Sequence, residues 1–289
     1  MKIHKDISIR ELTTFKIGGK SKYLFIPDNI DDVKTALLFL KENKLDYYIL
    51  GEGSNVLIGS KDYNGGVIST LNLNKIVLRD SFICAEAGVT NTNLSIFCCE
   101  KDIKGFEFLY YMPGTVGGSS VMNARAFGAS MSDIIVEVKA FNKELEMKTF
   151  LANEIKYDYK QSIFQNNDYF VVEVIFKIEK GDSRLIKSKM ESNKAKRLET
   201  KQYDFPSAGC IFKNNYDLGI PSGKLIDELG LKGDTIGDAQ VFEQHGNFII
   251  NKGNATSSDV IQLIEKIKNK AKKEKKINLE CEVKFHGNF

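Results

Sequence analysis

Residues 47–55 read YYILGEGSN, a short apolar run followed at once by a glycine-rich turn. The aromatic and aliphatic side chains of Tyr47–Leu50 predict a β-strand that ends at the turn. Glycine permits positive φ and close approach of the backbone to a ligand, and consecutive N–H groups in such a turn form an anion-binding nest. A tight turn without a ligand is the alternative, and the third glycine of the Rossmann dinucleotide fingerprint is missing. The candidate contacts to a diphosphate cofactor are Gly51, Gly53, Ser54 and Asn55.

A second glycine-rich loop reads PGTVGGS over residues 113–119 and continues into Met122-Asn123-Ala124 and Phe127-Gly128. It is placed to open a helix, and a helix N-terminus favours phosphate through its exposed N–H groups and its dipole. Two such loops are more specific than one, because together they can hold both ends of one pyrophosphate. The candidates from this loop are Pro113, Gly114, Thr115, Gly117, Gly118, Asn123 and Gly128.

The segments around the two loops predict a mixed α and β protein. Asn29 is placed to cap a helix that begins near Ile30 and buries Val33, Ala36, Leu37 and Leu40. A last helix begins at Ser257 or Ser258, with one apolar face formed by Val260, Ile264, Ile267 and Ala271. Other strands are expected at 22–26, 82–86, 169–178 and 247–250, and other helices at 91–101, 183–198 and 222–229. This order favours α+β layers over a plain parallel sheet.

Composition bears on the partners, the redox setting and the metal content of the protein. The chain has 289 residues and a net charge of +3, which gives no argument for a nucleic-acid or membrane partner. Its five cysteines are odd in number and form no C-x-x-C pair, which indicates a reducing, cytoplasmic setting. The N-terminus lacks the apolar region of a secretion signal, and the three histidines are too widely spaced for a structural zinc site, so no metal is expected. The lysines within 266–276 are read as a solvated helix face.

Two further residues have ordinary interpretations when each is taken alone. Cys210 lies in PSAGCIFKN (206–214), and a cysteine in such surroundings is by default a small buried hydrophobic residue. Glu282 lies in LECEV (279–283). If this segment is a strand, Glu280 and Glu282 point to the same side as a pair of surface carboxylates.

Taken in order, these segments resemble the UDP-N-acetylenolpyruvoylglucosamine reductases, the MurB family, from Thr13 to Glu282. The chain is similar to the shorter subclass, which lacks an extra insertion over the substrate. The matching pieces are TTFKIGG (13–19), LGEGSNVL (50–57), the loop 113–128, SAGCIFKN (207–214), KLID and GLKG (224–227, 230–233), HGNFIIN (245–251) and LECEV (279–283).

The resemblance implies an α+β chain with a two-lobed, vanillyl-alcohol-oxidase-type FAD-binding domain at 1–185, lobes at about 1–75 and 76–185, and an α+β substrate domain at 186–289. It implies that both loops hold FAD non-covalently and that NADPH is the co-substrate. Hydride passes from NADPH to the flavin and then to UDP-N-acetylglucosamine enolpyruvate, giving UDP-N-acetylmuramate for peptidoglycan synthesis, cell shape and cell division. A cytoplasmic monomer without nucleic-acid or membrane partners is expected.

The resemblance also implies roles for individual residues. Cys210 matches the proton donor, and its reference pKa of about 8.5 keeps a thiol protonated yet able to release the proton. Glu282 matches the catalytic glutamate, Lys160 takes the place of a catalytic arginine, and Tyr159 and Asn214 match substrate contacts. Hydride addition leaves an enolate beside a carboxylate, which positive or hydrogen-bonding groups must stabilise before a positioned acid protonates the carbon.

Three positions depart from the family pattern. Lys160 stands in Tyr159-Lys160-Gln161-Ser162-Ile163-Phe164 where arginine is usual, and lysine lacks the planar fork that grips a carboxylate. Arg125 replaces the glycine of Asn-Ala-Gly; it either compensates for Lys160 or points to the surface. Asn215 replaces a proline, a change expected to be minor.

Two other functions stay open at the level of sequence. One is another FAD-dependent carbohydrate oxidoreductase on the same fold, which should lack the set Cys210, Asn214 and Glu282. The other is a non-catalytic nucleotide-binding module, or a nucleic-acid-binding one that uses the basic last helix. A purified protein that is colourless and cannot be reconstituted with FAD would favour the non-catalytic module.

Overall fold

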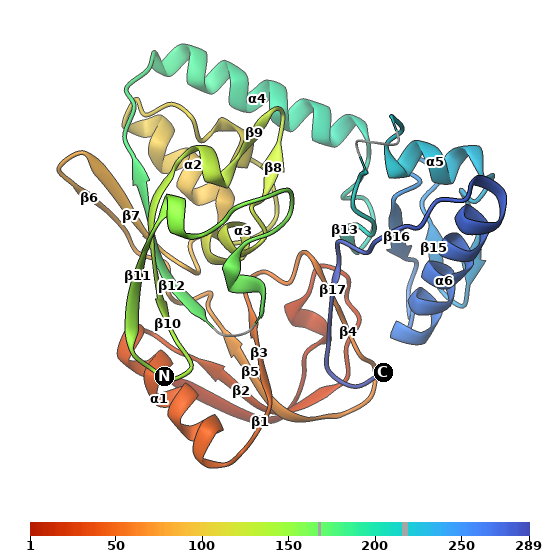
Figure 1. Cartoon of the computed structure of the whole chain (residues 1–289), viewed down its shortest axis with the longest axis horizontal. Coiled ribbons are helices and arrows are strands. Elements are labelled where there is room, and N and C mark those ends of the chain that lie inside the picture. The colour runs from red at the N-terminus through yellow and green to blue at the C-terminus, as the bar shows by residue number, and fades with distance from the viewer. Residues whose placement is uncertain (167–168, 216–218) are drawn as a thin grey trace. The chain divides into compact units, whose positions relative to one another are not determined.

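The computed structural model describes residues 1–166, 169–215 and 219–289 (Figure 1). The chain divides into two compact units, and neither is one continuous stretch of sequence. Unit 1 comprises Met1–His4, Tyr23–Glu52 and Gly65–Arg197. Unit 2 comprises Lys5–Lys22, Gly53–Asn64 and Leu198–Phe289. Two early segments therefore group with the C-terminal residues, while the division at residue 185 into ligand-binding domains stays a prediction.

Unit 1 is built on a five-stranded antiparallel sheet. Its strands in spatial order are β11 (Met147–Leu151), β10 (Ile135–Phe141), β12 (Phe170–Lys177), β7 (Phe82–Glu86) and β6 (Ile76–Arg79). Helices α2 (Asn91–Glu100) and α3 (Val116–Val121) share a hydrophobic core with this sheet. Helix α4 (Ser183–Glu199) is joined to the short helix η2 (Glu107–Leu109), because Asn193 Nδ2 donates to the Glu107 carbonyl at 3.0 Å.

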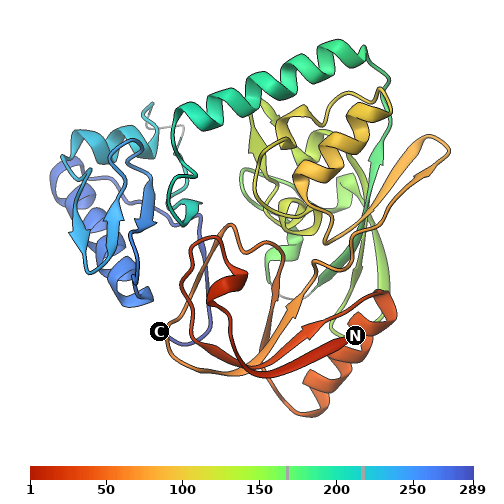
Figure 2. The same ribbon diagram turned by 180° about the vertical axis from the view of Figure 1, so that it is seen from behind.

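A four-stranded sheet lies beside helix α1 (Ile30–Glu42) in Figures 1 and 2. Its strands in order are β1 (Lys2–Ser8), β2 (Lys20–Ile26), β5 (Tyr63–Ser69) and β3 (Tyr47–Leu50), with β3 and β5 parallel. Asn29 caps α1 as predicted, accepting a hydrogen bond from Asp32 N–H at 2.9 Å. The apolar face of α1 is buried as predicted, at Val33, Ala36, Leu37 and Leu40.

Unit 2 holds a four-stranded antiparallel sheet and two helices. The strands in order are β13 (Ser207–Cys210), β16 (Phe248–Asn251), β15 (Ala239–Val241) and β14 (Thr235–Ile236). Helix α6 (Ser257–Lys275) begins with a capping box between Thr256 and Asp259, and its predicted apolar face lies in the core together with helix α5 (Ser222–Glu228). Near the C-terminus, β17 (Lys284–His286) pairs in parallel with β4 (Val56–Ile58).

The remaining elements are short. They are the hairpin of β8 (Arg125–Ala126) and β9 (Ala129–Ser130) and the 3-10 turns η1 (Arg10–Leu12), η3 (Met131–Asp133), η4 (Ala152–Glu154) and η5 (Ile163–Asn166). The predicted α+β class is confirmed. Within the described part of the chain, no helix combines the length and apolarity needed to cross a membrane.

Candidate active site

The two predicted glycine-rich loops meet in unit 1 at Gly51 and Thr115. A Cβ atom added to Gly51 would lie 2.4 Å from Thr115 Oγ1, so only glycine fits there without displacing the threonine. Gly114 N–H donates to the Glu52 carboxylate, and Asn91 N–H donates to the Gly114 carbonyl at 2.9 Å. The loops are therefore one hydrogen-bonded structure in this unit.

The second loop is anchored to the sheet where α3 begins. Thr115 caps α3 by accepting from Gly118 N–H at 3.4 Å, as Ser, Thr, Asp and Asn do at helix starts. Gly117 N–H donates to the Ala87 carbonyl at 2.9 Å, and a Cβ on Gly117 would lie 2.7 Å from Ala87 Cβ. Gly117 is thus required for packing inside the protein, which gives the loop a fixed shape.

The backbone at Gly118 and Gly128 of this loop, and the side-chain amide of Asn91 beside it, are open to a ligand. Gly118 is exposed, and a Cβ there would meet nothing closer than Thr115 Oγ1 at 3.6 Å. Gly128 has φ +82° and no atom within 4 Å of a Cβ. Among the described residues, buried Asn91 Nδ2 has no hydrogen-bond partner, although Asn91 Oδ1 accepts from the Ser119 hydroxyl at 2.9 Å. Pro113 is exposed beside them.

Replacing Gly51 and Gly118 separately by alanine should distinguish packing from ligand contact. Gly51→Ala pushes against the cap residue Thr115, so we expect it to destabilise the ligand-free protein by about 1–3 kcal/mol, as overpacking does. Gly118→Ala meets no clash, so the ligand-free protein should melt as wild type while its affinity for FAD falls. Thermal melts with and without FAD measure both. Equal melting of the two ligand-free variants would contradict this division of roles.

Asn123, predicted as a cofactor contact, has its amide engaged by the protein. The residue is buried at φ +42°; Asn123 Nδ2 donates to the Asp158 carbonyl and Oδ1 accepts from Ser132 N–H, each at 3.0 Å. Asparagine tolerates this left-handed conformation better than most residues. Asn123 therefore joins the second loop to the segment that carries Tyr159 and Lys160.

Tyr159 and Lys160 occupy the two central positions of a tight turn. Asp158 and Gln161 exchange two backbone hydrogen bonds of 3.2 Å around it, and Lys160 has φ +56°. A left-handed conformation costs a residue with a side chain about 1–2 kcal/mol. Gln165 Nε2 donates to the Lys160 carbonyl at 2.7 Å, which helps to hold this conformation. Both side chains are partly buried.

The remaining part of the first loop, residues 53–55, belongs to unit 2. Gly53 has φ +63°, and a Cβ there would lie 2.6 Å from the Leu12 carbonyl oxygen. Thr14 links this loop to strand β13: its N–H donates to the Gly53 carbonyl at 3.2 Å and its hydroxyl to the Ser207 carbonyl at 2.7 Å. Ser54 also lies near the strand, since its carbonyl oxygen is 3.9 Å from a Cβ placed on Gly209.

Cys210 and Glu282 come together on adjoining backbone segments of unit 2. Glu282 N–H donates at 2.8 Å to the carbonyl of Ile211, the residue that follows Cys210. Cys210 is a partly buried thiol outside any disulfide, and it ends a strand irregularity that begins after Ser207 and includes Gly209, which has φ +73°. Glu282 is only 8% exposed. Asn55 Nδ2 donates to the Glu282 carbonyl at 3.4 Å, so the first loop also reaches this place.

The segment 279–283 does not form the continuous strand that its sequence allows. Its contact with the segment after Cys210 is a single isolated bridge between Cys281 and Phe212, flanked by backbone hydrogen bonds at Glu280 and Glu282. The Glu280 carboxylate is exposed and forms an ion pair with Lys213, whereas Glu282 is buried. The two glutamates are therefore in different environments.

The strand after Glu282 carries two groups whose pKa is lowered by burial. Burial lowers the pKa of Lys284, with a further contribution from the nearby charge of Lys213. Burial also lowers the pKa of His286 to about 4, so this imidazole is neutral near pH 7. Lys284 N–H donates to the Asn55 carbonyl at 3.0 Å, which fixes the strand beside the first loop.

Asn214 and Asn247 hold the segment that follows Cys210. Asn214, a predicted substrate contact, uses its Oδ1 within the protein: this oxygen accepts from Ser222 N–H at 2.9 Å, at the start of α5. Asn247 is buried and clamps Phe212 from both sides, accepting from its N–H at 2.9 Å and donating to its carbonyl at 2.8 Å. Asn247 lies within the motif HGNFIIN, but no spacing in the sequence revealed this partner.

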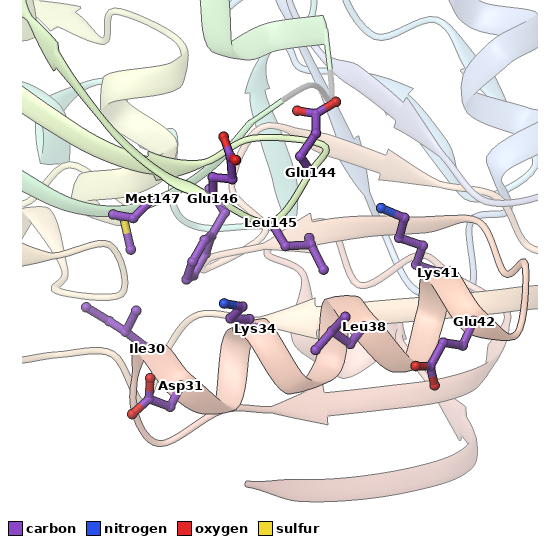
Figure 3. A pocket seen from close by; sticks show the side chains of 11 residues that line it. Ile30, Asp31, Lys34, Leu38, Lys41, Glu42, Glu144, Leu145, Glu146 and Met147 are labelled. Carbon is purple, nitrogen blue, oxygen red and sulfur yellow. The ribbon is translucent and has the colours of Figure 1, made fainter.

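A pocket of about 700 Å³ lies elsewhere in unit 1, between α1 and the turn that connects β10 to β11 (Figure 3). Its walls mix apolar side chains such as Leu38 and Met147 with charges of both signs, including Lys34 and Glu144. None of the predicted site residues lines it. Its chemistry gives no reason to place the reaction there.

Comparisons with known proteins identify the family. Residues 201–286 match the family model described as UDP-N-acetylenolpyruvoylglucosamine reductase, C-terminal domain, and residues 21–148 match an FAD binding domain. A UDP-N-acetylenolpyruvoylglucosamine reductase from Borrelia garinii subsp. bavariensis is 40% identical over 278 residues, covering 95% of this chain and 90% of the relative. The chain belongs to this family.

Other members support the same assignment. The reductase from Caldanaerobacter subterraneus subsp. tengcongensis is 36% identical over 99% of this chain and 94% of its own length. The crystal structure of the reductase from Thermus caldophilus superposes with a TM-score of 0.84, at 28% identity and 99% coverage of both chains. The predicted family and the predicted fold class are therefore confirmed.

Proposed function

We propose that this protein is an NADPH-dependent flavoprotein reductase that converts UDP-N-acetylglucosamine enolpyruvate to UDP-N-acetylmuramate. The observation that carries the proposal is the backbone pairing that places Glu282 beside Ile211, directly after Cys210. Family membership supplies the substrate class. The proposal includes a cytoplasmic, monomeric enzyme of peptidoglycan synthesis that binds neither nucleic acid nor membrane.

The residues of the glycine-rich loops fit a diphosphate cofactor. Unit 1 offers the open backbone at Gly118 and Gly128 and the unsatisfied amide of Asn91; unit 2 offers the turn 53–55. Backbone N–H groups and a helix start are the usual means of holding phosphate. FAD, held non-covalently, would supply hydride transfer from NADPH to the enolpyruvyl double bond.

Side chains of this protein then stabilise the negative charge that develops on the substrate and supply the proton that neutralises it. When hydride has added to the methylene carbon, negative charge develops on the neighbouring carbon and its carboxylate. Lys160 provides a fixed positive charge for it, and the buried Glu282 provides a preorganised partner, which is most effective away from water. Cys210 transfers its thiol proton to that carbon, leaving a thiolate that is reprotonated from solvent.

An anaerobic experiment in two stages tests the proposal. The purified protein should be yellow, lose its flavin absorbance on addition of NADPH, and regain it when UDP-N-acetylglucosamine enolpyruvate is added. UDP-N-acetylmuramate should appear in an amount equal to the flavin reoxidised. A protein that takes up no FAD, or whose reduced flavin is not reoxidised by this substrate in the absence of oxygen, would refute the proposed function.

A further inference from the structure

Glu52 is the one charged residue of the two glycine-rich loops, which read LGEGSN (50–55) and PGTVGGS (113–119). Proteins hold diphosphate with main-chain N–H groups and basic side chains, so a carboxylate is the least expected side chain in such loops. The Glu52 carboxylate accepts from Gly114 N–H, and within the described part of the chain it pairs with no lysine or arginine. A negative charge therefore already occupies a main-chain donor of the second loop.

Other N–H groups of the second loop are bound to main-chain carbonyls of unit 1. Val116 N–H donates to the Val89 carbonyl at 2.8 Å. Gly117 N–H donates to the Ala87 carbonyl at 2.9 Å, within packing that leaves no room for a Cβ atom. These four residues are buried, and breaking a buried hydrogen bond leaves its carbonyl unsatisfied, which is costly. Pro113 has no N–H to offer. A phosphate must therefore use other donors of this loop.

Two adjacent donors, Gly114 N–H and Thr115 N–H, are not committed to the main chain. The first is held by the Glu52 side chain, and for the second the described residues supply no hydrogen-bond acceptor. Thr115 is nevertheless only 1% exposed, and a buried main-chain N–H without a partner is rare. Glu52 is partly exposed, so its carboxylate can turn out into water, where a charge is well solvated. These are the donors of the loop that an anionic oxygen can take.

We propose that Glu52 is an exchange residue for the cofactor: a phosphate oxygen of FAD takes the Gly114 N–H in place of the Glu52 carboxylate, which then turns into solvent. The proposal rests on the proposed function, which makes FAD the cofactor, and extends it. Both groups are anionic acceptors that form charge-assisted hydrogen bonds, so they compete for one donor. A carboxylate that stayed beside the bound diphosphate would repel it. Glu52 thus preserves the shape of the loop and lowers its affinity for FAD.

The dissociation constant for FAD, measured on full-length protein freed of flavin, tests this inference through the direction of its change. Glu52→Gln keeps an oxygen of the same shape for Gly114 N–H but removes its charge. Because a charge-assisted hydrogen bond is roughly twice as strong as a neutral one, the amide competes less well, and FAD should bind about 10-fold more tightly. If Glu52 instead stays in place as a brace between the loops, the variant will bind FAD equally or more weakly, and either result overturns the inference. Thermal melts verify that the variant is folded.

Two smaller ligands show whether the phosphate is the part of FAD that competes with Glu52. ADP has a diphosphate but no isoalloxazine ring, whereas riboflavin has the ring but no phosphate. Glu52→Gln should bind ADP more tightly than the wild-type protein does, by a factor similar to that for FAD, and should bind riboflavin as the wild-type protein does. Tighter binding of riboflavin without tighter binding of ADP would place Glu52 beside the ring and would refute the exchange.

Glu191→Gln is the matched control for the change in net charge. Glu191 lies exposed on α4, and its substitution removes the same charge, so all three affinities should equal those of the wild-type protein. Tighter binding in this control as well would assign the effect to net charge and refute the role of Glu52. If the wild-type protein takes up FAD but Glu52→Gln binds it no more tightly, the inference is wrong while the proposed function stands. A wild-type protein that takes up no FAD would overturn the proposed function, and this inference with it.

Discussion

The Cys210→Ala variant should accept hydride from NADPH at close to the wild-type rate and then fail to pass it productively to the substrate. Loss of a positioned proton donor costs about 10²–10⁴ in rate, so reoxidation of the reduced flavin should slow by that factor. The effect is confined to the second half-reaction because the thiol acts only once the carbon has become basic. Stopped-flow absorbance measures the two half-reactions separately under anaerobic conditions.

Cys210→Ser is the matched variant for this prediction. A hydroxyl of similar size can occupy the same partly buried position at the end of β13 and can also transfer a proton. We expect substantial turnover to remain. Wild-type reoxidation in Cys210→Ala would rule out the proton-donor role and would return Cys210 to the ordinary interpretation of a residue packed beside Phe248.

Glu282→Ala should slow the same half-reaction by about 10²–10³, the range observed when one preorganised partner of a developing oxyanion is removed. Its main chain should keep its place, because the hydrogen bonds to Ile211 and Asn55 use backbone atoms of Glu282. Glu282→Gln separates two roles for the carboxyl group. An amide that retains much of the rate indicates hydrogen-bond donation to the enolate, and one that retains little indicates that the carboxyl group itself is needed.

Glu280→Ala is the control for this substitution. Glu280 lies two residues away, is exposed, and loses only an ion pair with Lys213, so its half-reactions should match wild type. Equal slowing in Glu280→Ala and Glu282→Ala would show that the effect arises from disturbing the segment and not from the buried carboxylate.

Local features of this fold could be predicted from the sequence because their signals are local. The cap at Asn29, the buried face of α1 and the apolar face of α6 follow from residue spacing within a single helix. The glycines of the two loops were identified from their conformational freedom, and the structure gives Gly51 and Gly53 a definite steric reason.

The partners that assemble the candidate site could not be predicted in this way. The Thr14 hydroxyl binds the Ser207 carbonyl across 193 positions, and the backbone of Glu282 binds that of Ile211; hydrogen bonds between distant segments leave no periodic pattern. The segment 279–283 has the alternation of a strand, but it forms one isolated bridge, at Cys281, and no continuous strand. These residues are predicted by the family motifs and not by periodicity.

The discontinuous make-up of unit 2 has a consequence for how the protein is made. Its core combines Phe15, Ile17 and Leu57 with Val283. Strand β4 pairs with β17, which lies at the end of the chain. During synthesis on the ribosome, the segments Lys5–Lys22 and Gly53–Asn64 cannot pack into unit 2 until almost the whole chain has emerged. Folding of unit 2 is therefore expected to be a post-translational event, and during synthesis those early apolar residues depend on transient protection from aggregation.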